Sequence, residues 1–245
     1  MIYSLTSAGP GKTANEDSIL IGTILQNDSV QINSCPAFGC VSIADGVGGN
    51  AGGSIASRKA LAKLATLEEG SQLDAATLRN YILEINEQLI NEARAIQSCE
   101  TMATTLTGVL LSERNSFLFY VGNTRAYILQ GSYLKQLTDD HTVFSWLMRT
   151  GRIKEAECCN KNEITNCLGG GNEQLASALK VVDLPKFNTL LLTSDGVHEY
   201  VDIDTLEEII NAQISGDEKC SLIEQQARNN GSQDDISIVL ISQEG

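Results

Sequence analysis

Four aspartates in this 245-residue sequence stand where a short apolar segment meets a turn. Asp45 and Asp195 each follow such a segment, and a glycine follows each of them. Asp17 and Asp234 come just before such a segment. A strand end holds a side chain in a fixed position, and a glycine lets a ligand approach the backbone closely. The four positions would suit a site in which carboxylates converge.

Converging carboxylates would favour a hard divalent cation, because like charges raise each other's pKa unless a cation offsets them. Mg²⁺ and Mn²⁺ prefer oxygen ligands, and two such ions about 4 Å apart can activate water and bind phosphoryl oxygens. Each aspartate taken alone is better explained as a turn residue or a helix cap. Both interpretations stay open here, since the residues alone do not show that the four side chains meet.

Short strands are predicted around these aspartates. Segments rich in Val, Ile, Leu and Thr and bounded by turn residues indicate strands at Ser18–Thr23, Cys40–Ala44, Thr105–Leu111, Ser116–Val121, Ala126–Gln130, Leu179–Val182, Thr189–Thr193 and Ile236–Ile241. The turns between Leu110 and Tyr133 predict an antiparallel meander. The fold class expected from these strands and the intervening helices is a layered α+β sandwich.

Helices are predicted at Ser54–Leu67, Asp74–Ile96, Asp204–Ile210 and Asp217–Ala227. Asp204 with Glu207 three residues later resembles a capping box. Residues 142–172 contain a possible short helix at Phe144–Arg149 and a polar stretch, and are predicted to form an irregular flap within a single domain 1–245.

The composition excludes several classes of protein. The 17 Lys and Arg against 31 Asp and Glu give a net charge of −14, which argues against nucleic-acid and anionic-membrane binding. Seven scattered cysteines without a C-x-x-C pattern argue against zinc and disulfide frameworks. No apolar run is long enough to span a membrane, and the first residues lack the features of a signal peptide. A monomer in the cytoplasm is expected.

A series of segments, in order along the chain, resembles the metal-dependent protein serine/threonine phosphatase family (type 2C, or PPM) in its compact bacterial form. The segments are Asn15–Ser18, Ala44–Gly49 with Gly52-Gly53, Met102–Leu106, Val121–Tyr127, Leu137–Thr142, Thr193–Val197 and Ser232–Ile236. Each match alone is weak, but the ordered set is specific.

The resemblance implies a four-layer α/β/β/α sandwich with two central antiparallel sheets. It also implies two Mg²⁺ or Mn²⁺ ions, with Asp45 bridging both, the Gly46 carbonyl binding one, Asp195 and Asp234 as direct ligands, and Asp17 and Glu16 holding metal-bound waters. The implied reaction is attack of a metal-bridging water or hydroxide on a phosphoserine or phosphothreonine ester, without a phosphoenzyme. The implied partner is a phosphorylated protein, whose phosphorylation a Ser/Thr kinase would supply.

The chain departs from the family pattern at three positions. Lys12 replaces the arginine that grips phosphate, and a lysine lacks the bidentate fork. Asn123 replaces an aspartate linked to a third metal, so two ions and not three are expected. Asn50 stands where many bacterial members carry a histidine that could act as general acid, a role typically worth 10²–10⁴-fold.

Other functions are weighed against this interpretation. Gly11-Lys12-Thr13 lacks the upstream glycine and the following helix of a phosphate-binding P-loop. The three departures motivate an alternative: a catalytically weak, phosphatase-like module that binds a phosphorylated partner. His141, Arg125 and Asp140 are expected to be structural, while His198 would either line the cleft or cap a helix.

Overall fold

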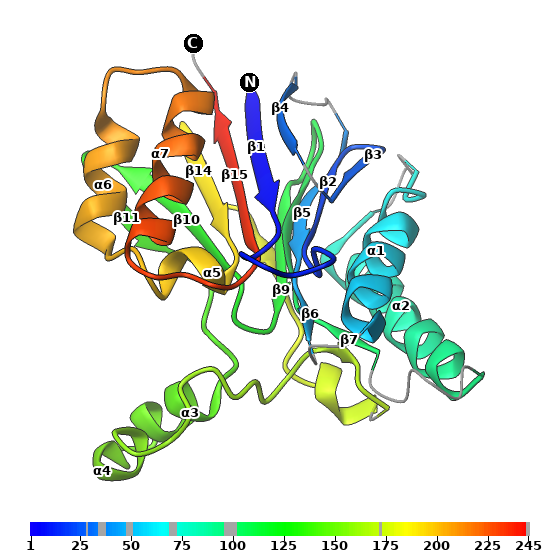
Figure 1. Ribbon diagram of the computed structural model, residues 1–245. Helices are drawn as coiled ribbons and strands as arrows, with labels where there is room; N and C mark the ends of the chain where they lie inside the picture. Colours follow the sequence, from blue (N-terminus) through cyan, green and yellow to red (C-terminus); the bar gives the residue numbers. More distant parts are fainter. Residues whose placement is uncertain are drawn as a thin grey trace.

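Two antiparallel sheets form the centre of the protein in the computed structural model, which describes residues 1–27, 29–33, 38–47, 51–68, 73–95, 102–171 and 173–243 (Figure 1). One sheet has the order β11 (Tyr133–Gln136), β10 (Arg125–Gln130), β14 (Thr189–Thr193), β15 (Ile236–Ser242), β1 (Ile2–Ser7) and β4 (Ser29–Asn33). The other has the order β13 (Lys180–Asp183), β9 (Phe117–Val121), β8 (Leu106–Leu111), β5 (Gly39–Ala44), β2 (Ser18–Ile21) and β3 (Ile24–Gln26). A short third sheet contains β12 (Leu168–Gly169), β7 (Ala103–Thr104) and β6 (Gly46–Val47).

Most side chains of the inner strands are buried, whereas the edge strands β11 and β13 are mostly exposed. Between the sheets, Ile43 and Val109 pack with Leu190 and Val239 in one core. Helices α1 (Ala51–Leu64) and α2 (Ala75–Ala95) cover one outer face. Helices α5 (Asp195–His198), α6 (Ile203–Asn211) and α7 (Gly216–Asn229) cover the other. This confirms the α+β sandwich with two central antiparallel sheets flanked by helices.

The predicted single meander between Leu110 and Tyr133 is wrong in one respect: it divides between the two sheets. Strand β9 pairs with β8 in one sheet, and β10 pairs with β11 and β14 in the other. The chain crosses at Gly122, whose φ of 109° suits glycine. A Cβ there would lie 2.6 Å from the Thr105 side chain, so a larger residue would not fit this crossing.

The cap predicted at Asp204 is also wrong. The N-cap of α6 is Asp202, whose Oδ1 accepts a hydrogen bond from the Thr205 backbone N at 2.9 Å. Glu207 does not close a capping box, because its Oε1 accepts from the backbone N of Leu134 at 2.8 Å. The side chain ties α6 to the edge of its sheet instead.

The predicted flap includes two short helices that project from the sandwich (Figure 1). Helix α3 (Val143–Arg149) confirms the expected short helix, and Thr142 caps it by accepting from the Ser145 backbone N. Helix α4 (Ile153–Ala156) follows, and a 3-10 turn, η1 (Glu173–Ala176), lies beyond β12. None of the helices in the described ranges is long and apolar enough to cross a bilayer.

Candidate metal centre

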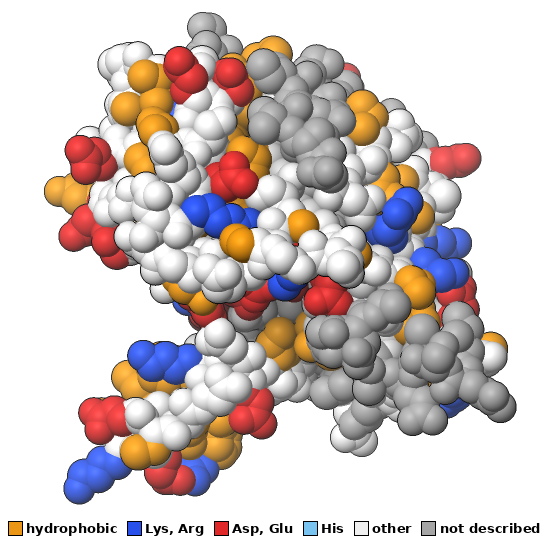
Figure 2. Space-filling view, in the orientation of Figure 1, with side chains coloured by type: hydrophobic (Ala, Val, Ile, Leu, Met, Phe, Trp, Pro, Cys, Tyr) orange, Lys and Arg blue, Asp and Glu red, His pale blue; other side chains and the backbone are white. Residues whose placement is uncertain are grey.

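Strand ends bring the predicted aspartates to one cleft. Asp17 precedes β2, Asp45 connects β5 to β6, and Asp195 follows β14 at the start of α5. Together with Asp234, just before β15, Asp45 and Asp195 line a cleft of about 770 Å³. Asp17 lies buried beside them. Figure 2 shows acidic side chains gathered in the hollow between the sandwich and the projecting flap.

Hydrogen bonds of its backbone fix the position of Asp45 in the cleft wall. Its backbone N donates to Thr105 Oγ1 at 3.1 Å, and its carbonyl accepts from the Thr105 N at 2.8 Å and the Thr104 hydroxyl at 2.9 Å. The next residue, Gly46, lies against Gly53, and a Cβ on Gly46 would lie 2.4 Å from the Gly53 carbonyl carbon. Glycine at both positions therefore allows the close approach that shapes this end of the cleft.

The carboxylates destabilise each other's charged forms. Burial, followed by repulsion from Asp195 and Asp17, raises the pKa of Asp45 well above its usual range. Burial also raises the pKa of Asp17, with Asp235 and Asp195 adding repulsion. The pKa of Asp195 rises because of burial and the nearby charge of Asp234. A cation in the cleft would relieve this repulsion.

Three buried oxygens at the cleft accept no hydrogen bond from the described residues: Glu16 Oε1, Asp17 Oδ2 and Asn123 Oδ1. An unsatisfied buried acceptor costs about 1–3 kcal/mol. Asn123 is oriented by its amide, whose Nδ2 donates to Asp195 Oδ2 at 3.0 Å. Oxygen acceptors without donors, beside mutually repelling carboxylates, form a donor set that fits Mg²⁺ or Mn²⁺.

Lys12 lies among these carboxylates. Its Nζ is 2.5 Å from Asp234 Oδ1 and 3.2 Å from Asp235 Oδ2. Although burial lowers the Lys12 pKa, its bonds to these carboxylates raise it overall. Among the residues described, no three Asp, Glu, His or Cys side chains enclose a cation position in their present orientation.

Asp235 is a supporting residue that the sequence analysis did not assign. It is buried, and its Oδ1 and Oδ2 accept from the backbone N of Gly9 at 2.8 Å and of Glu16 at 2.7 Å. It thereby fixes the loop that carries Lys12 against the start of β15. The doubled Asp234-Asp235 is the available sequence signal, but it does not show which carboxylate faces the cleft.

The other predicted polar residues lie outside the cleft. His141 is structural, as expected: its Nδ1 accepts from the Gly122 backbone N at 3.1 Å. Arg125 forms the expected pair with Asp140, with its Nε and Nη2 donating to the carboxylate at 2.6–3.2 Å. His198 Nδ1 lies 3.0 Å from Thr193 Oγ1, in a separate pocket of about 320 Å³. Asn50 lies outside the described residues.

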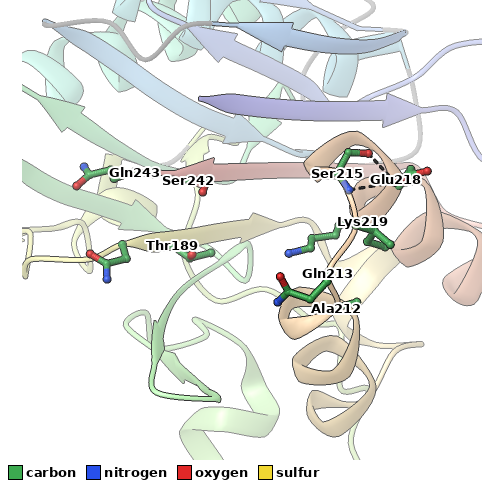
Figure 3. A pocket seen from close by; sticks show the side chains of 10 residues that line it. Thr189, Ala212, Gln213, Ser215, Glu218, Lys219, Ser242 and Gln243 are labelled. Carbon is green, nitrogen blue, oxygen red and sulfur yellow. Dashed lines mark hydrogen bonds between the residues drawn. The ribbon is translucent and has the colours of Figure 1, made fainter. Parts of the chain in front are cut away.

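A further pocket, of about 830 Å³, lies between the α6–α7 connection and the ends of β14 and β15 (Figure 3). Its polar groups largely satisfy one another. Lys219 Nζ donates to the carbonyl of Ile210 at 2.7 Å, and Ser215 donates to Glu218 Oε2. The pocket shares no lining residue with the carboxylate cleft.

Comparisons with known proteins show the family of the chain. The family model described as Protein phosphatase 2C matches residues 18–225. The chain is 32% identical over 210 residues to the serine/threonine phosphatase stp of Listeria welshimeri, covering 82% of this chain and 83% of that protein. It is 29% identical over 248 residues to the protein phosphatase PhpP of Streptococcus pneumoniae, covering 98% and 96%.

Solved structures extend the match over the whole chain. The serine/threonine phosphatase Stp1 from Staphylococcus aureus superposes with a TM-score of 0.81 at 26% identity, covering 100% of this chain and 95% of that one. A bacterial serine phosphatase superposes with a TM-score of 0.83 at 26% identity, covering 100% and 98%. The chain therefore belongs to the protein phosphatase 2C family of serine/threonine protein phosphatases.

Proposed function

We propose that this phosphatase hydrolyses phosphoserine and phosphothreonine in proteins with the help of two divalent cations, Mg²⁺ or Mn²⁺, held in the carboxylate cleft. The observation that carries the proposal is the cluster of Asp17, Asp45 and Asp195, whose pKa values are raised by burial and mutual repulsion. Such a cluster destabilises the folded protein at neutral pH unless a ligand compensates it. When bound, the ions would supply a nucleophilic water and withdraw charge from the phosphoryl oxygens.

Each residue is proposed to hold the ions in the way that the family resemblance implies. Asp45 would contact both, while Asp195, Asp234 and the Gly46 carbonyl would each contact one. Asp17 and Glu16 would hold the ions through water, which suits their unpartnered oxygens. Lys12 contacts Oδ1 of Asp234, so it would share this carboxylate with an ion.

Lys12 is proposed to bind the phosphate of the substrate. Its ammonium group lines the cleft beside Asp234, so it is placed to attract an anion as a point charge. Among the described residues that line the cleft there is no histidine, cysteine or tyrosine. The proton for the leaving serine or threonine oxygen is proposed to come from water, because Asn50 stands where many family members carry a histidine.

Two ions are proposed, because Asn123 takes the place of the aspartate that the family pattern links to a third ion. Its amide donates to Asp195 and orients that carboxylate. A neutral amide oxygen is a weaker ligand for a hard cation than a carboxylate.

The substrate is proposed to be a phosphorylated protein that a Ser/Thr kinase modifies, and the chain is proposed to act as a single-domain monomer in the cytoplasm. The names of the relatives support the phosphoprotein class. Residues 142–172 are proposed to select the substrate, since Asn162 and Ile164 line the cleft. Replacing this segment by that of a relative should change the preference among phosphoproteins; an unchanged preference would rule the segment out.

Phosphate release from a phosphothreonine peptide and from p-nitrophenyl phosphate tests the reaction. We expect release that requires Mn²⁺ or Mg²⁺ and falls at least about 10³-fold in Asp45→Asn and Asp195→Asn, because each removes a charged ligand. Asp183→Asn, at an exposed aspartate of β13, is the matched control and should retain activity. A wild-type protein that binds the phosphopeptide without turnover at millimolar Mn²⁺ would instead support the alternative, a phosphopeptide-binding module.

A further inference from the structure

A smaller pocket, of about 330 Å³, adjoins the carboxylate cleft. Lys12, Thr13, Ala14 and Ser54 line both. Arg58, near the middle of α1, lines only the smaller of these two pockets. A ligand that occupies the cleft at Lys12 therefore has a neighbouring space within reach of Arg58.

Asn15, in the wall of this pocket, forms hydrogen bonds through both its amide nitrogen and its amide oxygen. Its Nδ2 donates to Thr6 Oγ1 at 2.8 Å and to the carbonyl of Asn27 at 2.7 Å, and its Oδ1 accepts from the backbone N of Asp17 at 2.9 Å. Asn27 in turn donates to Ser18 Oγ at 3.1 Å. The amide of Asn15 therefore has no hydrogen left to donate to a ligand.

Arg58 is available by contrast. It is exposed, and within the described parts of the chain it forms no ion pair or side-chain hydrogen bond. A guanidinium group has five donors arranged in a fork that matches a carboxylate. Its position beside Lys12 gives the pocket two cationic residues.

The charge of the pocket differs from that of the protein around it. The chain has a net charge of −14, and the adjoining cleft contains Glu16, Asp45, Asp195, Asp234 and Asp235. None of the described residues that line the smaller pocket is acidic. An anionic side chain next to the substrate phosphate would therefore meet the positive charge of Arg58 in a pocket whose described lining has no carboxylate.

We propose that the pocket at Arg58 is a subsite for an acidic side chain of the substrate, so that the enzyme prefers phosphorylated residues with Glu or Asp nearby in the sequence. The inference rests on the proposed function, because the phosphate at Lys12 is what brings the acidic side chain to Arg58. A carboxylate on Arg58 would form a charge-assisted hydrogen bond at the surface.

Two phosphothreonine peptides that differ only in having Glu or Gln at the flanking positions test the subsite. For the wild type we expect kcat/KM to be about fivefold higher for the Glu peptide, mainly through KM, which is the upper range for an exposed ion pair. In Arg58→Gln the ratio should fall to about one. Arg94→Gln, at an exposed arginine of α2, is the matched control and should keep the ratio. The preference should also weaken in high salt.

Binding of the same peptides to the Asp195→Asn variant, measured by fluorescence anisotropy, gives a readout that needs no turnover. A preference for the Glu peptide that depends on Arg58 supports the subsite, even if the wild type proves inactive and the proposed function fails. Equal binding and equal kcat/KM for the two peptides would overturn the subsite while leaving the phosphatase reaction intact. A preference that survives Arg58→Gln would also overturn it.

Discussion

Asp140 and the cleft residues Asp17 and Asp45 are all partly or fully buried, but their carboxylates differ strongly in their hydrogen-bond partners. Asp140, whose side chain is 14% exposed, accepts from Arg125 through both oxygens, and Gln136 adds a third donor at 3.3 Å. Asp17, in contrast, keeps an oxygen without a donor among the described residues, and Asp45 faces another carboxylate. The fold itself supplies the hydrogen-bond donors of Asp140, whereas the cleft carboxylates would be satisfied only by a bound ligand.

The difference separates structural from functional aspartates better than sequence context does. Asp140 and Asp45 both lie in segments that resemble the family, and both lie outside helices and strands. Only the hydrogen-bond partners distinguish them. A buried carboxylate that the fold leaves unsatisfied lowers stability, and such groups are found where a ligand restores the balance.

The largest expected effect is on stability through the metal. At an ion concentration about 100 times the Kd, binding should stabilise the folded protein by about 2.7 kcal/mol, so chelation with EDTA should lower the Tm. In Asp17→Asn, the metal-free protein should melt higher than the metal-free wild type, because a buried, repelled carboxylate is gone. Differential scanning calorimetry with and without Mn²⁺ measures both. A Tm that is unchanged by EDTA would count against the metal centre.

The opposite result is expected for the satisfied pair. Asp140→Ala leaves the Arg125 guanidinium partly buried without its anion, and should lower the free energy of unfolding by about 2 kcal/mol. The gain in stability on adding Mn²⁺ should stay as in the wild type. Urea unfolding checks this, with Asp183→Ala as the exposed control. If Asp140→Ala abolished the Mn²⁺ effect, the two groups would not be independent.

A smaller effect is expected at Lys12, the cation that lies inside the unsatisfied group. Lys12→Arg should raise kcat/KM for a phosphopeptide severalfold, because the guanidinium fork binds phosphate in a bidentate manner. Lys12→Ala should lower it by more than tenfold. Lys63→Arg, on α1, is the control for a surface change of the same kind. Equal kcat/KM for the wild type and Lys12→Ala would show that Lys12 does not bind the substrate phosphate.

The smallest effect concerns Glu199, which lies beside the cleft. Burial, with repulsion from Asp195, raises the pKa of Glu199 to about 7. A carboxyl with a raised pKa binds more protons folded than unfolded, so stability falls as pH rises from about 4.5 to 7. In the metal-free protein, Glu199→Gln should reduce this loss in the free energy of unfolding by less than about 1 kcal/mol, since the Glu199 side chain is partly exposed. Glu208→Gln is the exposed control, and identical pH profiles for Glu199→Gln and the wild type would refute the assignment.

The sequence predicted the strands and helices that carry the site, because their apolar periodicity and turn residues are local signals. Asp17, Asp45 and Asp195 could be placed at strand ends for the same reason. The crossing of the chain at Gly122 from one sheet to the other could not be predicted, because a turn residue does not indicate which sheet the next strand joins.

Contacts between segments that are distant along the chain could not be predicted from the sequence either. The bond from Lys12 to Asp234 joins residues 222 positions apart. The anchoring of Glu16 by Asp235 spans 219 positions. Neither follows from periodicity or spacing, and the same is true of the Arg58 pocket, which depends on where α1 lies against the loop of residues 8–15.

The anchoring of Glu16 by Asp235 also affects when the site can form. Strand β1 pairs with β15, and Asp235 fixes the loop that carries Lys12. Contacts of such long sequence separation slow folding, because the intervening chain must be closed first. During synthesis on the ribosome, the carboxylate cleft cannot be assembled until β15 has emerged. The enzyme is therefore built so that phosphatase activity begins only after almost all of the described chain is available to fold.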